Sequence, residues 1–236
     1  MTAAPSPLRQ AFALAVALVA LAGPLAGMTL VSLTAPLYLH HLQTVAAPLL
    51  ALALVLFGGS ATGLALLPSF FLGAVCGFLL PGAWPFLAAA FGLAWATALG
   101  LYLGRLFSTN FLEVLLQRKA AWWDTYQRLG RAESGFLSTA VALLRLAPHM
   151  PFALTNLVCA RLPLTAATAW LASYIGLLPR TFFAAYIGSQ LQDWQKLLQR
   201  DTPPWELLLS LVLLALLTYL GRRAARRLKE ETAPPA

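Results

Sequence analysis

Charged side chains are scarce in this sequence. Only 10% of its 236 residues are charged, whereas 60% are hydrophobic. A soluble globule needs a water-facing shell rich in Lys, Arg, Glu and Asp, and this chain has too few of them to build one. The scarcity excludes a soluble globular protein and predicts a protein embedded in a membrane.

The signatures of catalysis and of metal binding are also missing. The chain has no GxSxG, Walker or HExxH motif and no acid pair spaced for general acid and base chemistry. Its two cysteines, Cys76 and Cys159, lie inside apolar stretches and form no CxxC motif, and His40 and His41 have no second pair at ligand spacing. We therefore expect no enzyme activity, no cofactor and no bound metal.

Long apolar runs are what the sequence does contain. They are clearest over 10–33, 84–106 and 205–220, and a helix needs roughly 20 residues to cross the hydrocarbon core. Alternating ten-residue strands are absent, and in lipid only helices then satisfy the backbone polar groups. The predicted fold is all-α. We expect residues 1–47 to form an uncleaved first span and an external loop; a cleaved signal peptide is the alternative.

The positive charge follows the hydrophobic segments rather than forming a nucleic-acid surface. Of the sixteen Lys and Arg, eleven lie at Arg9, over 105–131 and over 222–229. Cations gather on the cytoplasmic side of membrane proteins, so these three places and both termini are predicted to be cytoplasmic. No nucleic-acid partner is expected.

This orientation requires two stretches that enter the bilayer and return on the same side. Residues 48–81 must begin and end outside, before a helix over 84–107 runs inward, and Gly58, Gly59, Gly63 and Pro68 interrupt them. Residues 135–163 must dip in from the cytoplasm before a helix over 164–189 runs outward. We predict two re-entrant hairpins, with two tilted full spans as the alternative for 48–81. Residues 195–236 then supply a final span and a basic tail.

The two hairpins resemble copies of one unit. Aligned from Pro68 and Pro151, the first has Val75-Cys76 where the second has Val158-Cys159, and the following helices end in Tyr102-Leu103-Gly104 and Tyr186-Ile187-Gly188. Because the hairpins enter from opposite faces, the pattern predicts an inverted repeat with a binding site near the midplane.

Two arginines are predicted to lie inside the bilayer, where charge is costly and usually functional. Arg145 precedes the turn Pro148-His149-Met150-Pro151, and Arg180 follows Pro179. All eight acidic residues fall in loops or at membrane edges, so the enclosed site is predicted to favour an anion such as phosphate. Arg145, Asn156 and Arg180, with Pro148 and Pro151 at the turn, are the candidate binding residues. Alternatively, Arg145 ties the broken hairpin together through bonds to backbone carbonyls. His149 is a candidate proton carrier.

Between the hairpins, residues 110–130 have the apolar periodicity of an amphipathic helix. Asn110 and Glu113 are placed to cap its first turn, and Trp122 and Trp123 suit the headgroup level. We expect this helix to lie on the cytoplasmic leaflet, with binding of a partner protein as the alternative.

From Pro68 to about Trp194 the sequence resembles the VTT-domain superfamily, which joins the bacterial DedA proteins to the SNARE-associated Golgi protein family. The run Arg145-Leu146-Ala147-Pro148-His149-Met150-Pro151-Phe152, with Asn156, carries the resemblance. The remaining motif residues are Gly73, Gly77, Gly104, Arg105, Gly176, Pro179 and Gly188. It is most similar to the branch without a large soluble domain.

The resemblance implies paired re-entrant hairpins in a bacterial inner membrane, and translocation of phospholipids or polyprenyl phosphate in envelope homeostasis. Proton-dependent relatives carry acids near the first hairpin, whereas Leu67-Pro68-Ser69-Phe70 and its surroundings carry none. We therefore expect a lipid translocase or scramblase whose partners are anionic or phosphate-bearing lipids. A transporter of a small anion and a non-transporting membrane-assembly factor are the alternatives.

The predicted topology can be tested by cysteine labelling. We expect an impermeant reagent to label Ala83→Cys from outside and Ala132→Cys only after the cytoplasmic face is opened, because charge fixes the orientation. The reverse pattern would overturn the assignment.

Overall fold

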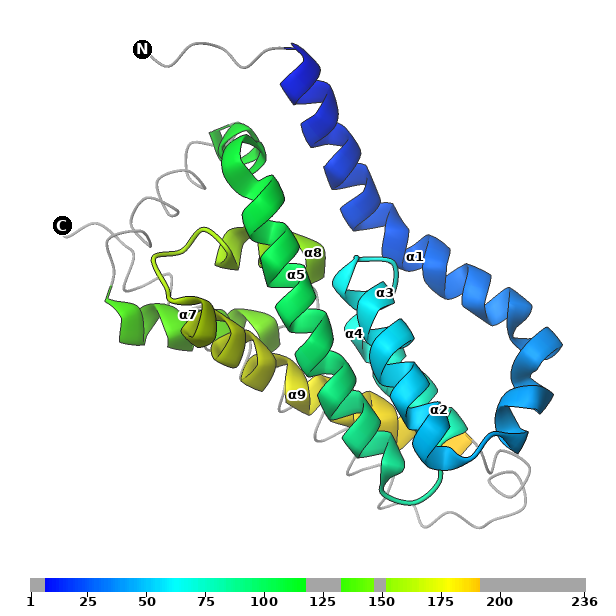
Figure 1. Ribbon diagram of the computed structural model, residues 1–236. Helices are drawn as coiled ribbons and strands as arrows, with labels where there is room; N and C mark the ends of the chain where they lie inside the picture. The colour runs from blue at the N-terminus through cyan, green and yellow to red at the C-terminus, as the bar shows by residue number, and fades with distance from the viewer. Residues whose placement is uncertain (1–6, 118–132, 147–151, 192–236) are drawn as a thin grey trace, which may run out of the picture.

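A computed structural model describes residues 7–117, 133–146 and 152–191. Every regular element in these ranges is a helix (Figure 1). The elements are α1 (Pro7–Thr44), α2 (Ala47–Ala53), η1 (Leu54–Gly58), α3 (Gly59–Gly63), α4 (Ser69–Leu79), α5 (Trp84–Gln117), α7 (Ser134–Leu146), α8 (Phe152–Cys159) and α9 (Ala166–Leu191). The predicted all-α fold is confirmed for this part of the chain.

Two of the described helices are long and apolar enough to cross a membrane. These segments are Ala22–Leu42, within α1, and Trp84–Leu106, within α5. Shorter apolar helices cover Ala47–Gly63, Ser69–Leu79 and Ser134–Leu146. The span expected over 205–220 lies outside the described residues.

The stretch predicted as the first hairpin folds as two helical arms joined by one turn. Its first arm runs without interruption from α2 through the π-helical segment η1 into α3. The predicted interruption at Gly58 and Gly59 is therefore wrong, because both adopt ordinary right-handed helical angles. The chain reverses between Gly63 and Ser69 instead, where Ala65 has a φ of 62° and the Leu66 N–H donates to Ala61 O at 2.8 Å. This bond satisfies a carbonyl at the end of the first arm.

Glycines in the first arm serve helix packing rather than turning. A Cβ at Gly59 would lie 2.8 Å from Gly92 O, and one at Gly63 would lie 3.0 Å from Ala96 O, both on α5. Small residues spaced four apart let two helix backbones approach in this way. Gly59 and Gly63 therefore mark a close contact between the first arm and α5.

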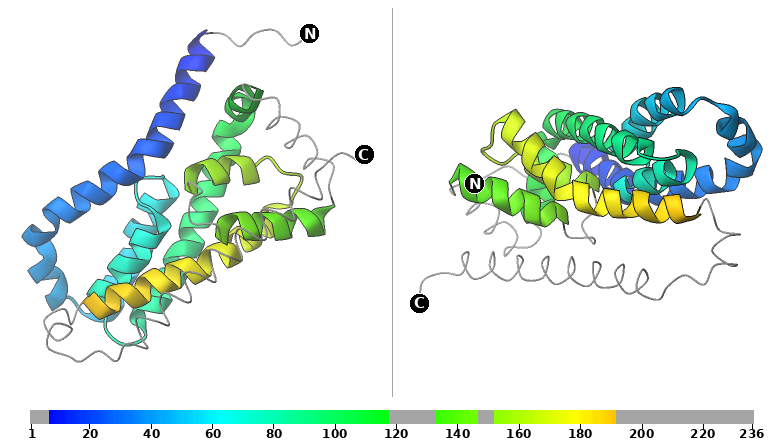
Figure 2. Two further views of the ribbon diagram at one scale, coloured as in Figure 1. Left: turned by 180° about the vertical axis from the view of Figure 1, so that it is seen from behind. Right: turned by 90° about the horizontal axis from the view of Figure 1, so that it is seen from below.

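The stretch predicted as the second hairpin contains α7 and α8, which we call its two arms, and the residues of its predicted turn, 147–151, lie outside the described ranges. Figure 2 shows α7 and the first hairpin on opposite sides of α5, with α9 crossing beneath. The first arm of each hairpin packs on the long helix of its own half, α3 on α5 and α7 on α9. The second arm packs on the long helix of the other half, α4 on α9 and α8 on α5. The two halves are therefore interlocked.

Helix α5 continues to Gln117, beyond the end expected at residue 107. Asn110 therefore does not begin a separate helix, because the preceding turn already offers acceptors to the N–H groups that a cap would satisfy. The rest of the predicted amphipathic helix, 118–130, is outside the described residues.

Glycine contacts between α4 and α9 give a stability prediction. A Cβ at Gly77 would lie 1.9 Å from Ala185 O, a backbone atom that cannot rotate away. We expect Gly77→Ala to lower the free energy of unfolding by about 1–3 kcal/mol, the usual cost of overpacking. Thermal unfolding in detergent measures it, with Gly135→Ala as the control because nothing lies within 4 Å of that site. Equal stability of the two variants would contradict the packing.

Candidate functional site

Arg145 is the centre of the polar interior. It lies in the last turn of α7 and is 1% exposed, the largest side chain among those fully buried. Helix periodicity places it one turn beyond Val141, which is also buried, so the apolar face of α7 carries it inward. A buried guanidinium is tolerated only where hydrogen bonds replace its hydration.

The acceptors of those hydrogen bonds lie on α8. Arg145 Nη1 donates to Thr155 Oγ1 at 2.7 Å and to Phe152 O at 3.3 Å, and Nη2 donates to Asn156 Oδ1. The guanidinium carbon also lies 5.3 Å from the centre of the Phe152 ring, in cation–π range. The side chain therefore joins the two arms of the second hairpin, as the structural alternative anticipated, although two of its three acceptors are side chains.

Arg145 is not saturated by these bonds. A guanidinium has five N–H donors, and the bonds to Phe152, Thr155 and Asn156 all come from its two Nη groups. Nε is buried and has no partner within the described residues. The group is thus held in place while its Nε–H is kept for another acceptor.

Asn156 is fixed between Arg145 and α5. A Cβ at Gly100 would lie 2.1 Å from Asn156 Nδ2, and one at Gly104 would lie 2.9 Å from Asn156 O. The absence of side chains at these two glycines is what lets Asn156, which is 3% exposed, reach Arg145. Asn156 thus helps to position Arg145.

Arg180 lies on α9, which continues through Pro179 without ending. It is half-buried, and its Nη2 donates to Ser69 Oγ at 2.8 Å. Its Nε is buried and has no partner in the part of the chain described. The sequence placed Arg180 in the bilayer but did not identify Ser69, although its position directly after the hairpin proline was the available signal.

The two arginines share one region of the interior. Gly176 contacts Arg145, since a Cβ there would lie 2.8 Å from Arg145 Cβ, and Arg180 is one turn further along α9. Among the described side chains the one carboxylate is that of Glu133, which is exposed, so no buried acid in this part of the chain neutralises the pair.

Three buried hydroxyls near the helix crossings were not singled out from the sequence. Thr62, Thr97 and Ser173 are all 0% exposed, and their hydroxyl oxygens have no partner among described residues. Such groups are usually satisfied by water when they are buried. Their signal, a hydroxyl within an apolar run, is too common to identify a site.

The motif glycines hold helices together. Gly73 and Gly77 contact the carbonyls of Thr181 and Ala185 on α9, and Gly188 contacts Ala74 O on α4. Gly176 contacts Ala142 O on α7.

Other predicted site residues are not brought into this cluster. Arg105 is exposed near the end of the apolar part of α5. Pro148, His149 and Pro151 lie outside the described residues. Within the described ranges no group of three His, Cys, Asp or Glu is placed to hold a metal.

Comparison with known proteins gives one match. A family model described as the VTT domain matches residues 67–190, just over half of the chain, and this range includes Arg145, Asn156 and Arg180. No curated protein and no solved structure matches the chain.

The role of Arg145 in joining the arms of the second hairpin predicts a specific loss of stability. In Arg145→Lys, one ammonium cannot reach Phe152 O, Thr155 Oγ1 and Asn156 Oδ1 together. We expect a loss of about 2 kcal/mol, typical of a hydrogen bond to a charged group, with faster amide exchange over α8. Hydrogen exchange and thermal unfolding measure this against Arg105→Lys, the same change at an exposed arginine. Unchanged exchange in α8 would contradict the role.

Proposed function

Because the chain belongs to the VTT-domain family, whose members are generally membrane-associated, we propose that it is a lipid translocase of the bacterial inner membrane. Its substrate is a phosphate-bearing lipid, either a phospholipid or a polyprenyl phosphate, and both termini are cytoplasmic. The observation that carries the proposal is the pair of interior arginines, Arg145 and Arg180, with no buried acid beside them in the described structure.

Charge balance favours an anion at this pair. Two guanidinium groups that share a low-dielectric interior repel each other, and neither has a carboxylate partner among the described residues. A phosphate placed between them converts this repulsion into attraction. Each arginine keeps an unused Nε–H, and guanidinium N–H groups match phosphate oxygens in geometry.

The amino end of α4 adds to the positive potential. Arg180 bonds Ser69, the first residue of α4, while the first helical bonds run from Phe71 and Leu72 to Pro68 O. The N–H groups of Ser69 and Phe70 therefore precede the hydrogen-bonded ladder, and such groups attract anions. In this proposal Arg180 and the amino end of α4 meet the phosphate, while Arg145 is held by α8 as the second cation.

Helix lengths favour hairpins that re-enter the membrane. The 11 residues of α4 span about 16 Å, far short of the roughly 30 Å hydrocarbon core. The alternative of two tilted full spans requires a longer second arm. In the proposed arrangement Leu80 lies at the bilayer surface, and Ser69 and Arg180 lie inside the hydrocarbon core.

The plan of contacts supports an inverted repeat and alternating access. Gly104 and Gly188, which end the matching Tyr-x-Gly motifs, each contact a carbonyl on the second arm of the opposite hairpin, that of Asn156 or Ala74. Related halves with a shared central site exchange inward-open and outward-open states by rocking against each other. The hairpins would expose the arginine pair to each leaflet in turn. Without an acid in the first hairpin, we expect no coupling to a proton gradient.

Translocation is measurable in liposomes that contain a phospholipid labelled on its headgroup. An impermeant reductant destroys label in the outer leaflet, so the rate of further loss reports movement between leaflets. We expect the protein to accelerate this loss and Arg180→Gln to reduce the acceleration about tenfold or more, as loss of a charge-assisted hydrogen bond implies. Arg145→Ala should also reduce it.

The matched control is Arg161→Gln, which removes one positive charge at the end of the second hairpin. Rates equal to those of empty vesicles, or full activity in both Arg145→Ala and Arg180→Gln, would overturn the proposal. Flux of inorganic phosphate without lipid movement would instead identify a transporter of small anions.

A further inference from the structure

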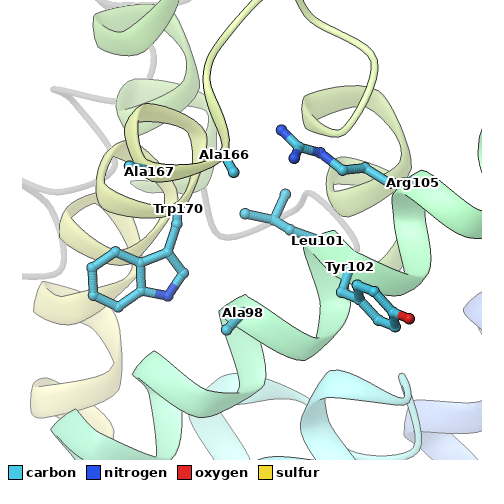
Figure 3. Close-up of a pocket in the computed structure, with 7 residues that line it drawn as sticks. All are labelled: Ala98, Leu101, Tyr102, Arg105, Ala166, Ala167 and Trp170. Atoms are coloured by element: carbon cyan, nitrogen blue, oxygen red, sulfur yellow. The ribbon is translucent and has the colours of Figure 1, made fainter.

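A second feature able to hold a ligand lies between the end of α5 and the beginning of α9. It is a pocket of about 390 Å³, lined on α5 by Ala98, Leu101, Tyr102 and Arg105, and on α9 by two alanines and Trp170 (Figure 3). Pockets that hold small ligands have volumes of roughly 300–1,000 Å³. None of its lining residues belongs to the arginine pair, so it is a separate site.

The wall on α9 is rigid and preformed. The Trp170 indole N–H donates to Ala94 O at 3.0 Å, which fastens the ring to α5. Its face stacks on Tyr174, with ring centres 5.3 Å apart and planes 5° apart. Because both contacts hold the indole at the edge of the pocket, an occupant meets an apolar surface that is already ordered.

Charge is confined to one end. Arg105 is exposed and is the one charged residue among the lining residues that the structure describes. Ala98 is seven residues earlier, two helical turns or about 10 Å away. Figure 3 shows Arg105 at one side of the pocket, with Ala98 and Trp170 further along it. An occupant that fits this pattern has an anionic head and an apolar body at least this long.

The position along α5 identifies the source of such a molecule. The candidate span Trp84–Leu106 ends one residue after Arg105, which places the cation where hydrocarbon gives way to headgroups. Tyr102, which is 60% exposed, lies at the same level, and tyrosine favours this interface. A phospholipid of the surrounding leaflet has its phosphate at this depth and its acyl chain alongside Ala98 and Trp170, whereas a soluble anion has no apolar body.

We propose that this pocket binds an anionic phospholipid, with its headgroup on Arg105 and one acyl chain against Leu101 and Trp170. Basic pockets between transmembrane helices recognise anionic headgroups in this manner. The bound lipid spans α5 and α9, the long helices of the two halves. The inference rests on the proposed membrane insertion of the chain and not on translocation. It is therefore tested by binding of the phospholipid alone.

Quenching of Trp170 fluorescence measures occupancy directly. The full chain is placed in nanodiscs containing acyl-brominated phosphatidylglycerol or phosphatidylcholine at equal mole fractions, and the Trp170 signal is the difference between wild type and Trp170→Phe. We expect about a fivefold preference for phosphatidylglycerol at Trp170, the effect of one basic residue at an anionic interface. Arg105→Gln should bring the two lipids near parity.

Arg161→Gln is the matched control, since it removes the charge of a residue that is not among those lining the pocket, and it should keep the preference. Equal quenching by both lipids in the wild type, a preference that survives Arg105→Gln, or equal loss in Arg161→Gln would overturn the site. Absence of quenching by either lipid would mean that another part of the chain fills the pocket, which also overturns it. Native mass spectrometry of retained phosphatidylglycerol gives the same comparison of Arg105→Gln with wild type if Trp170→Phe fails to fold.

Discussion

Direct contact between glycine and backbone carbonyls is the interaction on which the rest of the structure depends. Gly73, Gly77 and Gly188 bring α4 against α9, and Gly104 brings α8 against α5. Apolar side chains gain little by leaving lipid for one another, so helix association in a membrane relies on close packing and polar contacts. Without these glycines the second arm of each hairpin would stand away from the opposite long helix.

The polar interior follows from that packing. Gly100 makes the space in which Asn156 meets Arg145, and Gly176 lets α7 bring Arg145 beside the turn of α9 that precedes Arg180. The α4–α9 contact in turn brings Ser69 to Arg180. Two cations from different helices, α7 and α9, therefore share one region because backbones touch, and an anion is the partner that such a region favours.

The two lipid sites proposed for this chain differ in depth and in design. The arginine pair is enclosed by helices and keeps N–H donors for a headgroup that has left the membrane–water interface. The pocket at Arg105 lies beside the end of the candidate span. It receives a headgroup that remains at that interface. Both lie between the two halves of the chain. A lipid held at Arg105 would contact both α5 and α9. Alternating access requires a change in the packing of these same two helices.

The sequence by itself determined the helical class, the family and the presence of two interior arginines without nearby acids, because composition and motifs are local properties. It also predicted a reversal of the chain within residues 48–81, although it counted Gly58 and Gly59 among the interruptions when they continue a helix, and ended α5 too early. Only the tertiary structure decided that Arg145 is bound by α8 and that Ser69 meets Arg180. It also decided that each second arm packs on the opposite half. Those pairings join residues as far apart as Ser69 and Arg180, and periodicity along one helix carries no information about which distant backbone will fit against it.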